Sequence, residues 1–76
     1  MFSLTLKNNS TGGTQNFTDI PEVIVHTRHR AKRLDDTRKI LQAVLADNAA
    51  SIEFKANGKK FNKSLTEFTL TNLDRN

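Results

Sequence analysis

The chain has 76 residues, of which 36% are hydrophobic, and it carries a formal net charge of +4 at pH 7. This length predicts one domain, residues 1–76, whose single core supplies only about 3 to 5 kcal/mol of stability, and it leaves no room for a deep substrate cleft. The chain has no Cys, which excludes disulfides and thiolate metal sites, and it shows neither a membrane span nor a secretory signal, so we expect a cytoplasmic protein.

The chain begins with the pattern of a strand that buries one face. Phe2, Leu4 and Leu6 alternate with polar residues, which is the period-two pattern of a half-buried strand. Residues 8–18 are rich in Gly, Asn, Ser and Thr and contain little apolar surface. We therefore expect a flexible polar loop over residues 8–18.

Asp19 and Glu22 predict the start of a helix. They have the spacing of a capping box, and Pro21 falls in the first turn, where its missing N–H does no harm. Apolar residues then recur at helical intervals, which favours one long helix. Arg38 would fall inside the apolar stripe of a straight helix, so we expect a bend or break near residues 34–36.

A second interpretation remains open for the same segment. The β-branched residues 23–25 are typical of a strand, which would cover residues 22–28 and leave the helix to begin near Asp35 or Asp36, both good N-caps. Both interpretations include a helix over residues 37–47. The side chains expected on its buried side are Ile40, Leu41, Val44 and Leu45.

The strongest local signal is the dipeptide Asn57-Gly58. These two residues readily take positive φ, and alternating apolar residues flank them, which predicts a hairpin with a type I′ turn. A two-residue loop would place Phe54 opposite Phe61 on the core face. A further strand is expected around residues 67–71.

Together these elements predict an α+β fold in the order βαβββ. A four-stranded antiparallel sheet would carry one long or bent helix packed on one face. In element order this arrangement resembles the small ribosome-dependent mRNA interferase toxins. The resemblance implies ribonuclease activity, for which His26 and His29, beside neighbouring arginines, are the candidate acid and base.

Positive charge is concentrated in two groups. Residues 28–39 hold six of the twelve Lys and Arg residues against two Asp, a net charge of +4 that equals that of the whole chain. Such a surface attracts phosphates or carboxylates, although charged faces also serve solubility alone. The candidate binding residues are Arg28, Arg30, Lys32, Arg33, Arg38 and Lys39 in the first group, and Lys55, Lys59, Lys60 and Lys63 around the Asn57-Gly58 turn in the second.

We therefore expect a non-enzymatic module that docks on DNA, RNA or a nucleoprotein complex through a basic helix and a lysine-rich hairpin, without cofactor, metal or membrane. The alternative is a protein–protein interaction module or inhibitor, such as the accessory proteins of phages and mobile elements, whose arginines would engage carboxylates. The expected solvent face of the sheet has no aromatic residue, which disfavours recognition of single-stranded RNA by stacking. Two open sheet edges and a small core also allow a homodimer.

Overall fold

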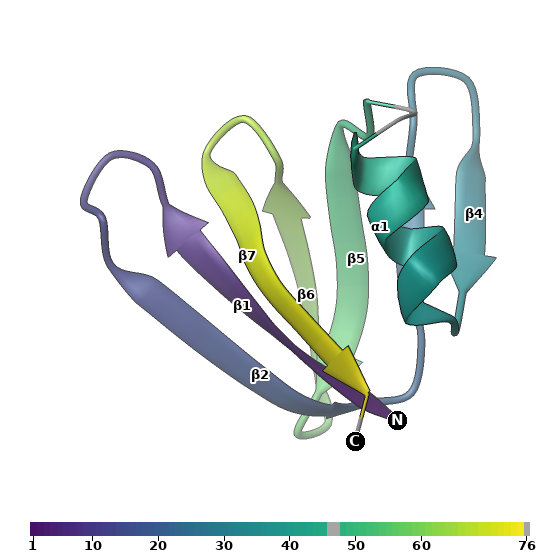
Figure 1. Cartoon of the computed structure of the whole chain (residues 1–76), viewed down its shortest axis with the longest axis horizontal. Coiled ribbons are helices and arrows are strands. Elements are labelled where there is room, and N and C mark those ends of the chain that lie inside the picture. The colour runs from purple at the N-terminus through teal and green to yellow at the C-terminus, as the bar shows by residue number, and fades with distance from the viewer. Residues whose placement is uncertain (46–47, 76) are drawn as a thin grey trace.

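The computed structural model describes residues 1–45 and 48–75, which form two antiparallel sheets and one helix (Figure 1). The elements are β1 (Phe2–Asn8), β2 (Thr14–Ile20), β3 (Val23–His26), β4 (Ala31–Leu34), α1 (Thr37–Leu45), β5 (Ser51–Ala56), β6 (Lys59–Ser64) and β7 (Phe68–Arg75). Sheet A has the strand order β2-β1-β7, and sheet B has the order β4-β3-β5-β6. The α+β class is confirmed, but the prediction of one four-stranded sheet with a long helix is wrong.

Residues 8–18, expected as a flexible loop, form the turn and most of the second strand of a hairpin. The side-chain oxygen of Asn8 accepts hydrogen bonds at 2.9 and 3.2 Å from two backbone N–H groups of the turn, and Gly12 donates to the Asn8 carbonyl at 2.8 Å. Strand β2 then pairs with β1, and it is anchored by the half-buried Phe17 and the buried Ile20. The prediction failed because local hydrogen bonds, rather than apolar burial, order the turn.

The segment for which we preferred a helix consists of two strands, so the second interpretation is confirmed. Asp19 caps no helix: it has a φ of 56° and lies at a bulge of β2, a backbone conformation that Asp tolerates. Val23 and Val25 are fully buried in β3, where β-branched side chains pack well. The observed element order has four strands before the helix, so the βαβββ order behind the resemblance to the mRNA interferase toxins is not found.

Helix α1 begins directly after its N-cap. The Asp36 carboxylate accepts a hydrogen bond from the Arg38 backbone N–H at 2.8 Å, as expected for a capping Asp. Ile40 and Ala43 are the buried residues of α1, because the small Ala43 side chain lets this side of the helix lie close to the sheets. The expectation that Leu41 and Leu45 are buried is wrong, since they are 37% and 75% exposed. The expected last turn of the helix, residues 46–47, lies outside the described residues.

The hairpin predicted at Asn57-Gly58 is confirmed. The two residues have φ values of 54° and 76°, and Phe54 pairs with Phe61 across β5 and β6. The strand that follows, β7, pairs with β1 instead of extending the hairpin. A turn closed by a hydrogen bond of 2.8 Å between the Ser64 and Thr66 hydroxyls redirects the chain to sheet A, where β7 satisfies the second edge of β1.

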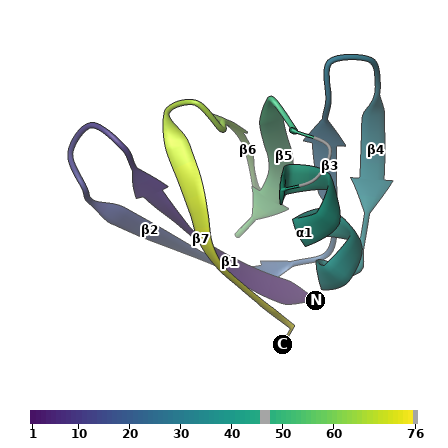
Figure 2. The same cartoon turned by 45° about the horizontal axis from the view of Figure 1, so that its top comes forward.

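The hydrophobic core lies where the two sheets converge beneath α1 (Figures 1 and 2). Phe17 of sheet A contacts both Phe54 and Phe61 of sheet B, with ring centroids 4.9 Å apart in each pair. Such aromatic pairs add about 0.5 to 1.5 kcal/mol each beyond the area they bury. These three rings therefore join the sheets. The fully or nearly fully buried residues are Phe2, Leu4, Leu6, Ile20, Val23, Val25, Ile40, Ala43, Ile52, Phe54 and Ala56.

Candidate anion-binding sites

A four-residue loop, residues 27–30, joins β3 and β4 and extends beyond the helix at one end of sheet B (Figures 1 and 2). Thr27 closes this loop. Its backbone N–H and its hydroxyl both donate to the Arg30 carbonyl, at 2.8 and 3.0 Å, and its hydroxyl also accepts from the Arg30 N–H at 3.3 Å. These bonds close the loop and leave Arg28 and His29 exposed at its tip.

The loop borders an open hollow of about 720 Å³. Arg28 and Arg30 line it from the loop, and Lys32 lines it from β4. Asn48 and Ala50, which come from the segment before β5, complete the wall. The residues that line this tip hollow, as we call it, are Thr27, Arg28, His29, Arg30, Lys32, Asn48 and Ala50. No carboxylate belongs to this lining within the described part of the chain, so the described lining is strongly cationic.

A smaller pocket of about 250 Å³ continues the positive surface toward the helix. Lys32 lines both the tip hollow and this pocket, and Lys39 of α1 lines the smaller pocket. Arg38 is exposed in the first turn of α1 and lines neither. The structure therefore brings together Arg28, Arg30, Lys32 and Lys39 along β4. The prediction that a helix carries the first group is wrong, because among its six residues α1 contains only Arg38 and Lys39.

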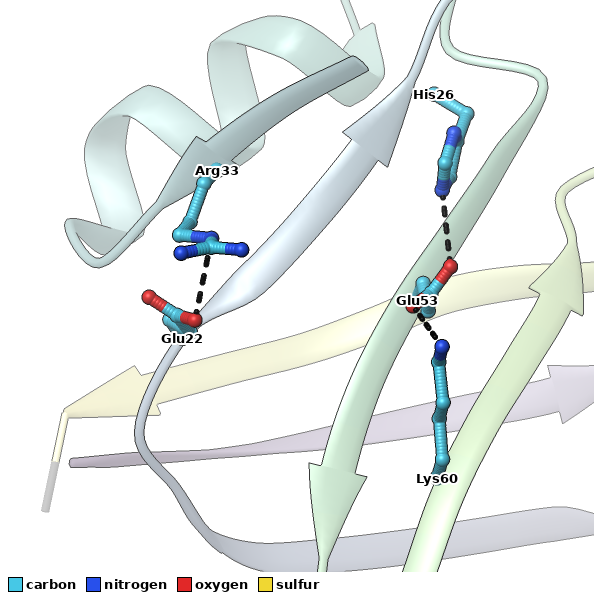
Figure 3. Close-up of polar contacts among 5 residues, drawn as sticks. All are labelled: Glu22, His26, Arg33, Glu53 and Lys60. Atoms are coloured by element: carbon cyan, nitrogen blue, oxygen red, sulfur yellow. Dashed lines mark hydrogen bonds and ion pairs between the residues drawn. The ribbon is translucent and has the colours of Figure 1, made fainter.

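Arg33 lies on the other side of the sheet. It pairs with Ile24 in the ladder and is on the face turned away from α1, where its Nε atom is 3.3 Å from Oε1 of Glu22 (Figure 3). We call this face the outer face of sheet B. The Arg33 side chain is 69% exposed, so this ion pair contributes little stability. The Glu22 carboxylate nevertheless compensates the charge of Arg33. Arg33 does not line the tip hollow.

Glu53 is the centre of a polar cluster on the outer face (Figure 3). Its two carboxylate oxygens lie 3.3 Å from His26 Nε2 and 3.0 Å from Lys60 Nζ, and its side chain is only 15% exposed. The hydrogen bond from Lys60, followed by the one from His26, lowers the pKa of Glu53 below its ordinary value, although desolvation opposes the shift. The outer face is thus largely charge-compensated by its own side chains.

The two histidines do not form a common site. His26 contacts Glu53 on the outer face, whereas His29 lines the tip hollow. The acid–base pair that the ribonuclease hypothesis requires is therefore not assembled from these two residues. Among residues 1–45 and 48–75, no three His, Cys, Asp or Glu side chains lie close enough to hold a metal ion.

The four lysines of the second group differ in their side-chain contacts. Lys55 and Lys59 are exposed beside the Asn57-Gly58 turn, while Lys60 is engaged with Glu53. The ammonium group of Lys63 lies 4.8 Å from the centroid of the Phe68 ring, a cation–π contact that places it on the half-buried flank of β6. Lys55 and Lys59 are therefore the exposed lysines of this hairpin that form no ion pair or cation–π contact with another described residue.

Arg28 and Arg30 lie at one end of sheet B, and Lys55 and Lys59 lie at the other. His26 pairs with Ser51 at one end of the antiparallel ladder, and Ala56 pairs with Lys59 at the other. The loop after β3 and the turn after β5 consequently extend in opposite directions (Figure 1). The predicted residues do not form one continuous patch.

The site also contains residues that the sequence did not single out. Thr27 closes the loop, and Asn48 and Ala50 supply part of the wall of the tip hollow. The placement of Thr27 before a short turn is a weak local signal, because Thr hydroxyls often bond to nearby backbone groups. Asn48 and Ala50 gave no such signal, since they reach the hollow only through the pairing of β5 with β3.

In the described residues, no helix has the length and apolar character needed to cross a bilayer. The chain matches no model of a known protein family, no curated protein and no solved structure.

Proposed function

We propose that this protein binds the phosphate backbone of duplex nucleic acid through the tip hollow. The observation that carries the proposal is the convergence of Arg28, Arg30 and Lys32 on one open concavity whose described lining has no carboxylate. Guanidinium groups bind phosphate oxygens in a bidentate manner, and lysine adds a mobile point charge. Lys39, in the adjoining pocket, extends the surface for a second backbone contact.

The composition of the hollow favours nucleic acid over a protein partner. Protein interfaces concentrate apolar and aromatic residues at their centre, whereas interfaces with nucleic acids are polar and strongly positive. Ala50 is the single apolar residue among the described residues that line the tip hollow. A repeating phosphate backbone therefore suits this surface better than the mixed surface of a protein.

The absence of exposed aromatic rings favours contacts to the backbone rather than to bases. The chain has no Trp or Tyr, and each of its five Phe side chains is buried or half-buried. Single-strand binders stack bases on exposed aromatic rings, a contact that this protein lacks. We therefore expect binding that depends on salt and duplex geometry and little on sequence.

The test compares two double variants that each remove two positive charges. Fluorescence anisotropy with a labelled DNA duplex, repeated over a series of salt concentrations, gives the slope of log affinity against log salt. Arg28→Gln/Arg30→Gln should make this slope shallower by about 1.8, that is about 0.9 for each lost phosphate contact. The matched control is Arg33→Gln/Arg75→Gln, whose positions are exposed but lie outside the tip hollow.

A salt slope near zero on DNA and RNA duplexes alike would end the proposal, and so would equal losses in the two double variants. Capture from an extract with and without nuclease distinguishes the alternative of a protein partner, because a protein complex survives the treatment. Cleavage of a labelled RNA by the wild type, abolished in His26→Ala and His29→Ala, would support the ribonuclease hypothesis instead.

A further inference from the structure

The β5–β6 hairpin is a second cationic element, separate from the tip hollow. Lys55 and Lys59 are exposed on either side of its turn, and neither forms an ion pair with another described residue. Lys55 pairs with Lys60 on the outer face, whereas Lys59 pairs with the buried Ala56 on the inner face. The tip of the hairpin therefore carries positive charge on both of its faces.

Two exposed lysines beside a tight turn suit the phosphates of a nucleic-acid backbone, to which ammonium groups bind as point charges. The inner face of the hairpin packs against Phe17 of sheet A, so the accessible part is the tip. Asn57 and Gly58 keep the hairpin narrow, since their φ values of 54° and 76° close the loop with two residues. Lys55 and Lys59 are the side chains that would contact the phosphates.

The hairpin and the tip hollow face in opposite directions. They lie at the two ends of sheet B, in a molecule that measures 29 × 28 × 20 Å. The outer face between them carries the carboxylates of Glu22 and Glu53, each engaged with its own cation (Figure 3). Two elements that point in opposite directions present their cations to different segments of nucleic acid rather than to one straight duplex.

We infer that one molecule bridges two duplex segments, with the tip hollow on one segment and the β5–β6 hairpin on the other. The inference rests on the proposed function, because the tip hollow must bind the first duplex. It adds a second contact and a consequence: the monomer brings two nucleic-acid segments together without a partner subunit.

A bead assay measures bridging directly. A biotinylated DNA duplex is fixed on streptavidin beads, a fluorescent duplex of the same length is added free, and the fluorescence retained is recorded against protein concentration. The wild type should retain the free duplex. Lys55→Gln/Lys59→Gln should reduce retention at least about tenfold, while its affinity for a single duplex in anisotropy should change less than about threefold, since the tip hollow is intact.

Three further measurements separate the explanations. Arg28→Gln/Arg30→Gln should lose bridging and bind a single duplex more weakly, and the matched control Arg33→Gln/Arg75→Gln should retain both properties. Sedimentation equilibrium without DNA should give a monomer at the assay concentration. Single-duplex binding without bridging in the wild type would overturn the inference and leave the proposed function standing. Undiminished bridging by Lys55→Gln/Lys59→Gln would also overturn it, and loss of all binding in the wild type would overturn both.

Discussion

Lys32 and Arg33 are adjacent in the chain, yet they lie on opposite faces of sheet B. Lys32 pairs with the buried Val25 on the side covered by α1, and Arg33 pairs with Ile24 on the outer face. The alternation of a β-strand thus directs these two neighbouring cations to opposite faces of the sheet. Lys32 lines the tip hollow, whereas Arg33 is engaged with Glu22.

This pair provides a test in which both variants lose one positive charge. Lys32→Gln should make the salt slope of duplex binding shallower by about 0.9, because one phosphate contact is lost. Arg33→Gln should leave the slope within error, because Arg33 faces away from the hollow. Anisotropy titrations over a salt series measure both slopes. Identical slopes in the two variants would mean that net charge, and not the tip hollow, governs binding.

Glu53 should make stability depend on acid pH. Lys60 and His26 lower the pKa of Glu53 in the folded protein, so the ionised carboxylate stabilises the fold above its unfolded pKa of about 4.3. This contribution is lost as the pH falls through the lowered folded value. Thermal unfolding at neutral pH should show a lower melting temperature for Glu53→Gln than for the wild type, and the difference should shrink below about pH 4. Glu67→Gln, at an exposed position, is the control and should show no such convergence.

Gly58 should tolerate no side chain without loss of stability. Its φ is 76°, and a Cβ there would meet no atom within 4 Å, so the cost of Gly58→Ala is conformational and should be about 1 to 2 kcal/mol. Gly13→Ala is the control, because the new Cβ would make an ordinary contact 3.4 Å from the Thr11 hydroxyl and the backbone needs no positive φ. Urea denaturation gives both free energies of unfolding. A loss as large in Gly13→Ala would contradict the conformational explanation.

Phe17 should determine whether the two sheets unfold as one unit. Its ring contacts Phe54 and Phe61, with centroids 4.9 Å apart in each pair. Because Phe17 is half-buried, Phe17→Ala should lower the free energy of unfolding, measured by urea denaturation, by about 2 to 3 kcal/mol, which is below the range for fully buried rings. That is a large share of the stability expected at this size, about 3 to 5 kcal/mol. Phe17→Leu should cost less, since it retains apolar volume. A change below about 0.5 kcal/mol for Phe17→Ala would show that the rings do not couple the sheets.

The sequence correctly predicted features that depend on residues close together in the chain. The Asn57-Gly58 turn and the register of Phe54 with Phe61 followed from backbone preference and alternation. The start of α1 agrees with the second interpretation, in which Asp35 or Asp36 is the N-cap. Each of these features is decided by residues within a few positions of one another.

Two of the errors concern segments whose structure depends on pairing with residues distant in the chain. Residues 19–34 have apolar spacings compatible with a helix, but β3 becomes a strand because β5 pairs with it and buries Val23 and Val25. Likewise, β7 pairs with β1, some sixty residues earlier in the chain. The identity of the cationic residues could be predicted from the sequence, but their distribution over two ends and two faces required these long-range pairings.

The closure of the β3–β4 loop by Thr27 has an evolutionary consequence. The hydroxyl of Thr27 bonds to backbone atoms of Arg30, so the side chains at positions 28 and 29 contribute nothing to holding the loop shut. Replacement of these two side chains can therefore change the charge of the tip while the loop stays closed. Replacement of Thr27 would instead remove hydrogen bonds that close the loop, so over evolutionary time the shape of the loop should be constrained more tightly than the charge at its tip.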